Sequence, residues 1–547
     1  MNDIKRDIGR QSGTPPTDYP AGFTCLTHFS DPFPVSPPPG NILESRFVLS
    51  LITNLLFEAR AAAQALVELT TGPHVRLGVT GLSRAGKTIF ITALVDNLIK
   101  AASPALRGRK NPLPVFRVHA DGRLISGMLE PQPDDAVPRF AYEDHIAALT
   151  GPKGRPGERH WPLSTRRISE LRLCLVFDQK IGRRPGHQSL TIDIVDYPGE
   201  WLLDLPLLGK SFGQWSREAF GASAGAARAP LAAKWRALAA STDPRAKADE
   251  ERVRREAELF TRYLRACRAD ENHFSSLPPG RFLMPGDLDG SPALTFVPLA
   301  VEEGEIYPPG SFAAMMERRY EAYKAHVVTP FFRDHFARLD RQIVLVDALA
   351  ALNAGPAAMR DLETALTDVL AAFRVGRGNL LSALFRPKID KILFAAAKAD
   401  HLHHTSHDRL EAILRHLTKR AISRVETVGA EVDVIALSAV RATREGMVGV
   451  PDEPTLEAVI GTPLEGERIG DEIFDGQAEA AIYPGELPID PEAVFRDAPR
   501  IEPNEIDYRF VRFRPPVPVR AEDGSLLPPP HIRLDRALQF LLGDRLG

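Results

Sequence analysis

Residues 81–88 read Gly-Leu-Ser-Arg-Ala-Gly-Lys-Thr and match the pattern G-x-x-x-x-G-K-S/T of a phosphate-binding loop. Glycines in such a loop permit the backbone conformations that turn successive N–H groups toward one anion. Lys87 can reach the β- and γ-phosphates of a nucleotide, and the Thr88 hydroxyl can bind Mg²⁺. An apolar run precedes the motif and a helical pattern follows it, which argues against a chance glycine turn. The expected contacts with the nucleotide are Gly81, Ser83, Arg84, Ala85, Gly86, Lys87, Thr88 and Ile89.

A second segment, at residues 190–200, ends an apolar run in the pattern Asp-x-x-Gly. Asp196, at the C-terminal edge of a predicted strand, can hold Mg²⁺ through water, and the Gly199 amide can meet a γ-phosphate. Glu200 stands where many small GTPases carry a glutamine that orients the attacking water. Because an ionised glutamate can accept a hydrogen bond from that water, Glu200 joins Lys87 as a candidate catalytic residue.

A third segment, Trp-Pro-Leu-Ser-Thr-Arg-Arg at residues 161–167, lies just before a predicted strand. The hydroxyl and carbonyl of Thr165 can close over Mg²⁺ and the γ-phosphate, so Thr165 is a candidate catalytic residue. It is also a candidate metal ligand, together with Thr88 and Asp196. Arginines can supply positive charge in the transition state or simply lie on the surface, and the candidates are Arg84, Arg166 and Arg167.

Lys398 and Asp400 end another strand-like run and resemble the N-K-x-D base-reading motif of GTPases, with Ala397 where Asn is usual. Asp400 can accept hydrogen bonds from N1–H and the exocyclic amino group of guanine, a pair of donors that adenine lacks. The stem of Lys398 can lie along the plane of the base. A loop one helix and one strand later resembles the backbone loop that meets guanine O6, and its expected contacts are Ser438, Ala439 and Val440.

These motifs follow one another in the order found in GTPases, and they predict a protein that binds GTP or GDP with Mg²⁺. We expect slow hydrolysis of GTP and a role as a molecular switch. Ala397 removes the tether that Asn provides between the base loop and the phosphate loop, so ATP stays a competing ligand. The same motifs are compatible with an ATPase of another P-loop class and with a scaffold that uses bound nucleotide only for folding. A small-molecule kinase is disfavoured, because it would not need the base-reading pair.

Strands and helices alternate around these motifs and must position them. Apolar runs within residues 75–81, 341–349, 390–400 and 432–440 predict buried strands, and helical patterns separate several of them. A Gly-Arg-Arg-Pro-Gly turn predicts that the runs at residues 168–177 and 189–199 pair as an antiparallel hairpin. The fold class that follows is α/β, with a mostly parallel sheet of the P-loop NTPase, GTPase-like kind and helices on both faces.

Changes of composition divide the chain into domains. We expect a Pro-rich N-terminal arm (1–42), a first part of the GTPase-like domain (43–200), a helical insertion domain (201–341), a second part of the GTPase-like domain (342–450) and a loop-rich C-terminal region whose terminal helix packs on the core (451–547). Residues 105–165, rich in Gly, Pro and charge, are expected to form an extended loop. One insertion helix carries a narrow apolar seam, which predicts packing within the chain, with a partner-binding coiled coil as the competing interpretation: Val253, Ala257, Phe260, Leu264 and Cys267.

The composition restricts partners and location. The 68 basic and 71 acidic residues nearly cancel, so no strong field favours nucleic acid. The 3 cysteines have no metal-ligand spacing, which fits reduced thiols in the cytosol. The apolar run at residues 47–57 is shorter than the roughly 20 residues of a membrane-spanning helix, and no secretion signal is expected at the N-terminus. We expect a cytoplasmic protein, leave open a peripheral association with the inner membrane, and expect a protein partner at the insertion or the switch segments.

With these motifs, the chain resembles the YcjX family of bacterial P-loop proteins. The resemblance is carried by residues 81–88, 161–173, 193–208 and 397–400, and by the C-terminal segment from Phe513 to Leu546, so it covers most of the chain. It implies a stress-associated, GTP-binding, GTPase-like domain with a helical insertion. It also implies an association with envelope-stress or phage-shock systems.

Overall fold

The computed structural model describes residues 73–82, 85–103, 111–132, 134–151, 156–164, 167–179, 186–269, 272–302, 304–372, 389–426, 430–449, 455–496 and 508–547. Four candidate residues, Ser83, Arg84, Thr165 and Arg166, lie outside these ranges. The predicted Pro-rich arm, residues 1–42, also lies outside them.

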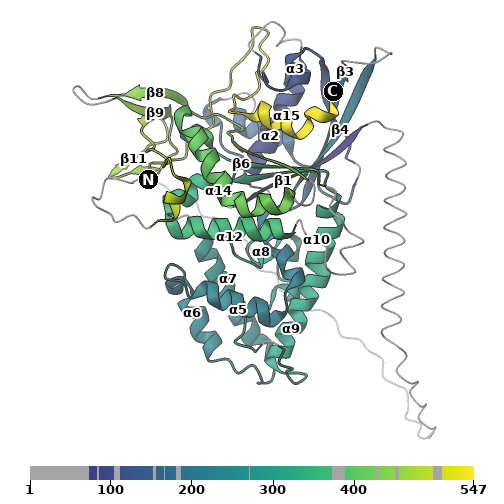
Figure 1. The fold of residues 1–547 in the computed structure, drawn as a ribbon, viewed down its shortest axis with the longest axis vertical. Helices are drawn as coiled ribbons and strands as arrows, with labels where there is room; N and C mark the ends of the chain where they lie inside the picture. The colour runs from purple at the N-terminus through teal and green to yellow at the C-terminus, as the bar shows by residue number, and fades with distance from the viewer. Residues whose placement is uncertain are drawn as a thin grey trace, which may run out of the picture. The chain divides into compact units, whose positions relative to one another are not determined.

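A sheet of seven strands forms the centre of the fold, in the order β2-β3-β4-β1-β5-β6-β7 (Figure 1). Its strands are β1 (His74–Leu82), β2 (Leu124–Glu130), β3 (Ser169–Asp178), β4 (His187–Asp196), β5 (Arg341–Val346), β6 (Lys391–Ala396) and β7 (Glu431–Ala436). From β4 to β7 all neighbouring strands are parallel, whereas β2 and β3 form antiparallel pairs at one edge. The predicted hairpin is confirmed as β3 and β4, and the predicted mostly parallel sheet is confirmed as well.

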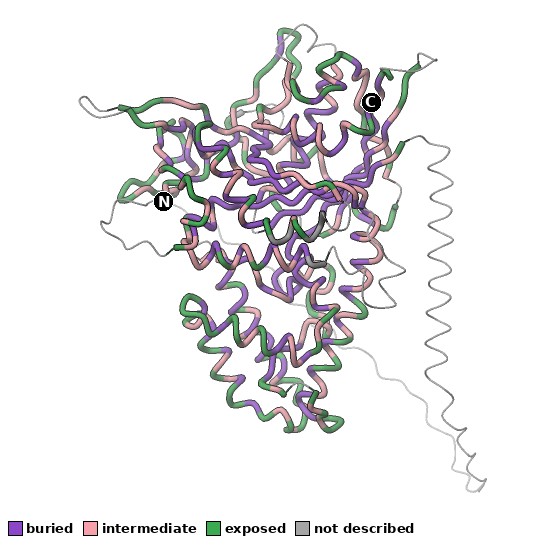
Figure 2. The backbone as a smooth tube through the Cα atoms, viewed as in Figure 1, coloured by how far each residue is buried: buried purple, intermediate pink, exposed green. Residues whose placement is uncertain are grey.

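Helices cover both faces of this sheet, because its strands alternate between two apolar clusters. In β5, Ile343 and Leu345 face the cluster that contains α2 (Lys87–Ala101), α4 (Tyr142–Thr150) and α15 (Leu534–Leu542). Val344 and Val346 face the other cluster, which contains α12 (Pro356–Ala372) and α14 (His407–Glu426). Figure 2 shows the resulting band of buried residues through the sheet. The predicted α/β fold class is therefore confirmed.

The segment between β4 and β5 is helical. It contains η4 (Gly199–Gly209), α5 (Phe212–Ser223), α6 (Ala229–Ala240), α7 (Glu250–Arg268), α8 (Gly280–Leu283), α9 (Phe312–Tyr323), the π-helical turn η7 (Lys324–Val328) and α10 (Thr329–Asp334). The predicted apolar seam lies on α7, and its five residues are all buried in a cluster shared with the other helices of the segment. This confirms packing within the chain. Aromatic rings from Trp215, Trp235 and Phe260 form the centre of that packing.

The expectation of an extended loop over residues 105–165 is wrong. This region contains the short helix α3 (Arg117–Ala120), the edge strand β2 and the helix α4. β2 is only partly buried along its length and has one neighbour, β3. Such a strand lacks the continuous apolar run that marks a central parallel strand, so its sequence does not reveal it.

The C-terminal region adds a small antiparallel sheet of β8 (Arg444–Val448), β9 (Leu456–Gly461) and β12 (Ala480–Ile482). The strand-like run after Tyr508 is extended but forms only an isolated bridge, between Pro463 and Phe513. The final helix, α15, returns to the central sheet, and its apolar face is buried as predicted: Leu534, Leu538, Leu541 and Leu542. Among the described residues, no helix has the length and apolar character needed to cross a membrane.

Candidate functional site

The phosphate-binding loop lies where the sheet changes direction. β1 has β4 on one side and β5 on the other, so the strand order reverses there. In open α/β sheets, ligands bind at the C-terminal ends of the strands beside such a point. β1 ends at Leu82 and α2 begins at Lys87, which places the loop at this position.

Gly86 supplies the conformation that the loop requires. Its φ is +80°, in the left-handed region that favours glycine, and its carbonyl accepts the hydrogen bond from the Phe90 amide that opens α2. The first turn of α2 has no acidic residue and no side-chain cap. The partial positive charge of this helix end is therefore available to an anion.

Lys87 and Asp196 meet at this edge of the sheet. The Lys87 ammonium lies 2.6 Å from a carboxylate oxygen of Asp196, and both side chains are largely buried. Asp196 ends β4, where it is in register with Val79 of β1, so the parallel pairing of β1 and β4 fixes its position. Thr88, the next residue of the loop, is also buried. The structure thus brings together the ammonium and the carboxylate of two predicted residues, and it buries the hydroxyl of a third beside Lys87 in the chain.

Gly199 packs directly against the loop strand. A Cβ atom at this position would overlap with the carbonyl oxygen of Gly81 and would press on the Thr80 hydroxyl. Only a glycine permits this approach of two backbones. The Asp-x-x-Gly segment therefore touches the start of the phosphate-binding loop, as its predicted role requires.

The predicted base-reading residues lie in two loops at the ends of β6 and β7. Lys398 adopts a left-handed conformation, with φ +62°, and its ammonium pairs with Asp347 at the end of β5. Asp400 is buried, and one of its carboxylate oxygens accepts a hydrogen bond of 2.9 Å from the Ala442 amide. The Ala399 amide donates to the Leu437 carbonyl, which joins the two loops.

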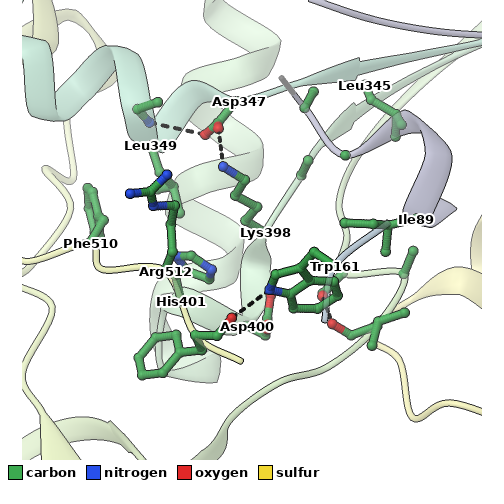
Figure 3. A pocket seen from close by; sticks show the side chains of 18 of the residues that line it. Ile89, Trp161, Leu345, Asp347, Leu349, Lys398, Asp400, His401, Phe510 and Arg512 are labelled. Carbon is green, nitrogen blue, oxygen red and sulfur yellow. Dashed lines mark hydrogen bonds and ion pairs between the residues drawn. The ribbon is translucent and has the colours of Figure 1, made fainter. Parts of the chain in front are cut away.

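One pocket of about 570 Å³ connects these loops with the phosphate-binding loop (Figure 3). Its volume lies within the range of small-molecule sites, roughly 300–1,000 Å³. Predicted residues line both ends: Ala85, Gly86 and Ile89 at one, and Lys398, Asp400, Ser438, Ala439 and Val440 at the other. The phosphate-binding loop and the two base-end loops therefore share one cavity, whereas Lys87, Thr88, Asp196 and Gly199 are not among the residues that line it.

Several residues of the pocket were not predicted. Trp161 lines it, and its indole N–H donates a hydrogen bond of 2.6 Å to the Phe513 carbonyl. Asp347 comes directly after the buried strand β5, and Asp196 is the last residue of β4, so the same rule could have found Asp347. His273, Arg512 and Phe513 lie in irregular segments whose sequence gives no local signal of a site.

Glu200 contacts the helical segment between β4 and β5. It is not among the residues that line the pocket, and its carboxylate is paired with Arg268 at the end of α7. Ser164, the described neighbour of Thr165, does line the pocket. Burial lowers the pKa of His401, another lining residue, against the opposing effect of Asp400, so its imidazole is neutral at neutral pH.

Comparison with known proteins shows the family of the chain. Residues 75–546 match the YcjX-like family, DUF463. A relative from Escherichia coli strain K12, the Ras-like GTPase YcjX, is 39% identical over 492 residues, which cover 88% of this chain and 98% of the relative. A second relative of the same name, from Shewanella oneidensis strain MR-1, is 36% identical over 496 residues, which cover 88% of this chain and 97% of the relative. With its GTPase-like α/β fold and a family match over nearly its whole length, the chain belongs to the YcjX-like family.

Proposed function

We propose that this chain binds GTP and GDP, hydrolyses GTP slowly with Mg²⁺ and acts as a stress-related molecular switch. The observation that carries the proposal is the shared pocket, which has the N-terminus of α2 at one end and Asp400 at the other. A nucleoside triphosphate has its negative charge and its base at opposite ends in the same way. The names of the two relatives support the same activity.

At the phosphate end, the amides around Gly86 and the helix end would bind the phosphates, and Lys87 would neutralise part of their charge. Lys87 is paired with Asp196 in the structure, so the incoming phosphate would compete with this carboxylate for the ammonium. The Gly199 amide, held against Gly81, is the further donor proposed for the γ-phosphate.

At the base end, Asp400 supports guanine over adenine. One of its oxygens already accepts from the Ala442 amide, and a carboxylate has enough lone pairs to accept two more hydrogen bonds. Guanine offers these two donors on one edge, whereas adenine would leave the buried carboxylate without them. Trp161 adds an aromatic surface to the pocket (Figure 3).

Mg²⁺ fits the donors present. Thr88 and Asp196 supply a hydroxyl and a carboxylate at one edge of the sheet, which are the oxygen ligands that Mg²⁺ prefers, and Thr165 is the third proposed ligand. When bound, the ion would offset the negative charge on the phosphate oxygens.

In the proposed reaction, a water oxygen forms a bond to the γ-phosphorus. The bond from that phosphorus to the β–γ bridging oxygen breaks, which yields GDP, inorganic phosphate and a proton. Glu200 is the proposed acceptor for the attacking water, with Thr165 ordering the segment before β3. Because Glu200 is engaged by Arg268, we expect slow turnover. Loss of the γ-phosphate would release the segments that contain Thr165 and Gly199, which is the proposed switch.

We further propose a cytoplasmic location, with peripheral membrane contact left open, and a protein partner that contacts the helical segment between β4 and β5. An ATPase of another P-loop class and a scaffold that binds nucleotide without hydrolysing it are the competing functions. Engagement of Glu200 by Arg268 is the observation that favours the scaffold.

Calorimetric titration of the purified chain with GTP, GDP and ATP, each with and without Mg²⁺, tests the ligand. Multiple-turnover phosphate release tests hydrolysis. The proposal expects GTP and GDP to bind more tightly than ATP, and GTP to be hydrolysed only with Mg²⁺. Equal affinity for ATP would favour the ATPase, and tight GTP binding without any phosphate release would favour the scaffold.

A further inference from the structure

The segment that follows Gly199 packs against helices of the chain between β4 and β5 and against α12. η4 runs from Gly199 to Gly209, and most of its residues are buried. Its first residue contacts the phosphate-binding loop through Gly81. Its remaining length contacts α7, α8 and α9, and it also packs on α12. η4 therefore connects the candidate nucleotide site with the helical segment.

Glu200 is held at two points. Its carboxylate pairs with the Arg268 guanidinium, at the C-terminal end of α7, and this pair is largely shielded from solvent. Its backbone carbonyl lies against Gly280, the first residue of α8, so closely that a Cβ at that position would overlap with the carbonyl. Both the side chain and the backbone of the proposed water-binding residue are thus fixed by the helical segment.

The next residues of η4 are held by the same helices. Asp204 is buried, and its carboxylate accepts hydrogen bonds from the Gly280 amide at 2.7 Å and the Tyr323 hydroxyl at 2.6 Å. The Trp201 indole donates to the Met284 carbonyl at 2.9 Å, which ties the first turn of η4 to the end of α8. These are buried, directional contacts, and they fix η4 far more firmly than a surface ion pair would.

The segment that follows α7 also reaches the candidate pocket. His273, a few residues beyond Arg268, lines the pocket that contains Gly86 and Asp400. The Phe274 amide bonds to the Cys267 carbonyl, so the turn that carries His273 is fixed to the last turn of α7. A displacement of this helix end would act on Glu200 and on the pocket together.

We propose that Arg268 is a positioning residue that restrains GTP hydrolysis, because it holds the Glu200 carboxylate in an ion pair with α7. The inference rests on the proposed function and adds its regulation. A contact that draws α7 away from η4 releases Glu200, which then accepts from the water that attacks the γ-phosphorus. The slow intrinsic rate is a property of this restraint, and the helical segment is the surface through which a partner relieves it.

The test measures single-turnover GTP hydrolysis by Arg268→Ala with Mg²⁺. We expect the rate constant to rise about fivefold, because a partly shielded ion pair of this kind is of modest strength. GTP affinity should change little. The Lys variant, Arg268→Lys, keeps a cation near Glu200 and should return the rate toward that of the wild type. Arg262→Ala, which removes an exposed arginine of the same helix paired with Glu258, is the matched control.

Two further measurements separate the possible outcomes. In the double variant Arg268→Ala, Glu200→Ala the rate constant should not rise, because the increase in Arg268→Ala depends on the freed Glu200 carboxylate. Hydrogen exchange of the peptide from Gly199 to Gly209 should be faster in Arg268→Ala than in the wild type, and this measurement does not depend on hydrolysis. If the wild type hydrolyses GTP measurably and the rate in Arg268→Ala is unchanged or lower, the proposed role of Arg268 is wrong while the proposed GTP hydrolysis stands. Bound GTP without hydrolysis in either protein would overturn the proposed hydrolysis as well.

Discussion

Lys87 and Asp196 carry opposite charges at the ends of two neighbouring parallel strands, and each is needed for a different part of the proposed site. Their ion pair keeps a largely buried ammonium and a buried carboxylate compensated within the protein. A triphosphate with Mg²⁺ would supply a new partner to each of them, the phosphate to Lys87 and the cation to Asp196. The pair therefore holds an ammonium and a carboxylate in the positions where the phosphate and Mg²⁺ are proposed to bind.

Replacing Lys87 with Ala should lower the affinity for GTP by about 100-fold, because the charged hydrogen bonds from its ammonium to phosphate are lost. Titration calorimetry measures the affinity. Lys100→Ala is the control, since Lys100 lies on the same helix and pairs with Asp96 away from the pocket. Equal affinities for wild type and Lys87→Ala would remove this residue from the site.

η4 is the element that connects the phosphate end of the pocket with the rest of the molecule. Its first residue, Gly199, allows the backbone to touch Gly81, and its middle is held by hydrogen bonds to Asp204. Because η4 is held at its first residue and at its middle, a displacement at one of these points is transmitted to the other.

Gly199→Ala should displace η4, because the new methyl group would overlap with the Gly81 carbonyl and the backbone there cannot move without distorting β1. We expect phosphate release to fall at least about tenfold and the free energy of unfolding to fall by about 1–3 kcal/mol. Gly209→Ala is the control at the other end of η4, where a Cβ meets nothing within 4 Å. If Gly199→Ala and Gly209→Ala lower phosphate release and the free energy of unfolding equally, the contact of Gly199 with Gly81 has no special role.

The carboxyl group of Asp204 makes the attachment of η4 sensitive to pH. Burial raises the pKa of Asp204 from 3.8 to about 6, and hydrogen bonds from Tyr323 and Gly280 offset this only in part. The folded protein therefore keeps a proton at pH values where the unfolded chain has lost it. Below pH 3.8 the carboxyl group is protonated in both the folded and the unfolded state, so its ionisation does not affect the free energy of unfolding. Above about pH 6 it is ionised in both states, and the folded state then carries the full cost of a buried charge. The contribution of Asp204 to the free energy of unfolding should thus decrease as the pH rises between them, by at most about 1.4 kcal/mol per pH unit.

Asp204→Asn removes this charge and keeps an acceptor for the Gly280 amide. The thermal midpoint of the wild type should fall relative to that of Asp204→Asn as the pH rises from 3.8 to about 6, since only the wild type has a carboxyl group at this position. Using the difference between the two proteins cancels the titration of other groups. A difference that stays constant over this range would show that Asp204 keeps an ordinary pKa.

Elements with a strong local pattern were predicted well from the sequence. The strands β1, β5 and β6 are buried over nearly their whole length, β7 is buried over its last three residues, and all four appear as apolar runs. The antiparallel pair of β3 and β4 was marked by its turn. The edge strand β2 was missed because it is only partly buried. The contact of α7 with η4 could not be predicted, because nothing near Glu200 or Arg268 in the sequence indicates that these two residues meet.

At the scale of the whole molecule, the candidate site is assembled from segments that are distant in sequence. The two predicted ends of the pocket come from the loops after β1, β6 and β7, and parallel strand pairing alone brings these loops to one edge. This part followed from the sequence, because strand ends and motifs coincide. The walls of the pocket could not be predicted in this way, because Trp161 is positioned by a hydrogen bond to Phe513, which is distant in the sequence.

The central claim is that one pocket binds a guanine nucleotide, with Asp400 at the base. This claim depends on the hydrogen-bonding character of one side chain, which can be changed without changing its size. Asp400→Asn replaces one acceptor with an amide donor, while the remaining oxygen can still accept from the Ala442 amide and so preserve the loop. Guanine then meets a donor where it also donates, whereas xanthine offers a carbonyl oxygen at that position.

The most direct test is titration of wild type and Asp400→Asn with GTP and with xanthosine triphosphate, both with Mg²⁺. Asp408→Asn, at an exposed carboxylate of α14, is the matched control. We predict that the affinity ratio of GTP to xanthosine triphosphate falls by about 100-fold in Asp400→Asn and stays unchanged in the control. An unchanged ratio in Asp400→Asn, in a protein that still binds GTP, would contradict the account, because the base would then be read elsewhere.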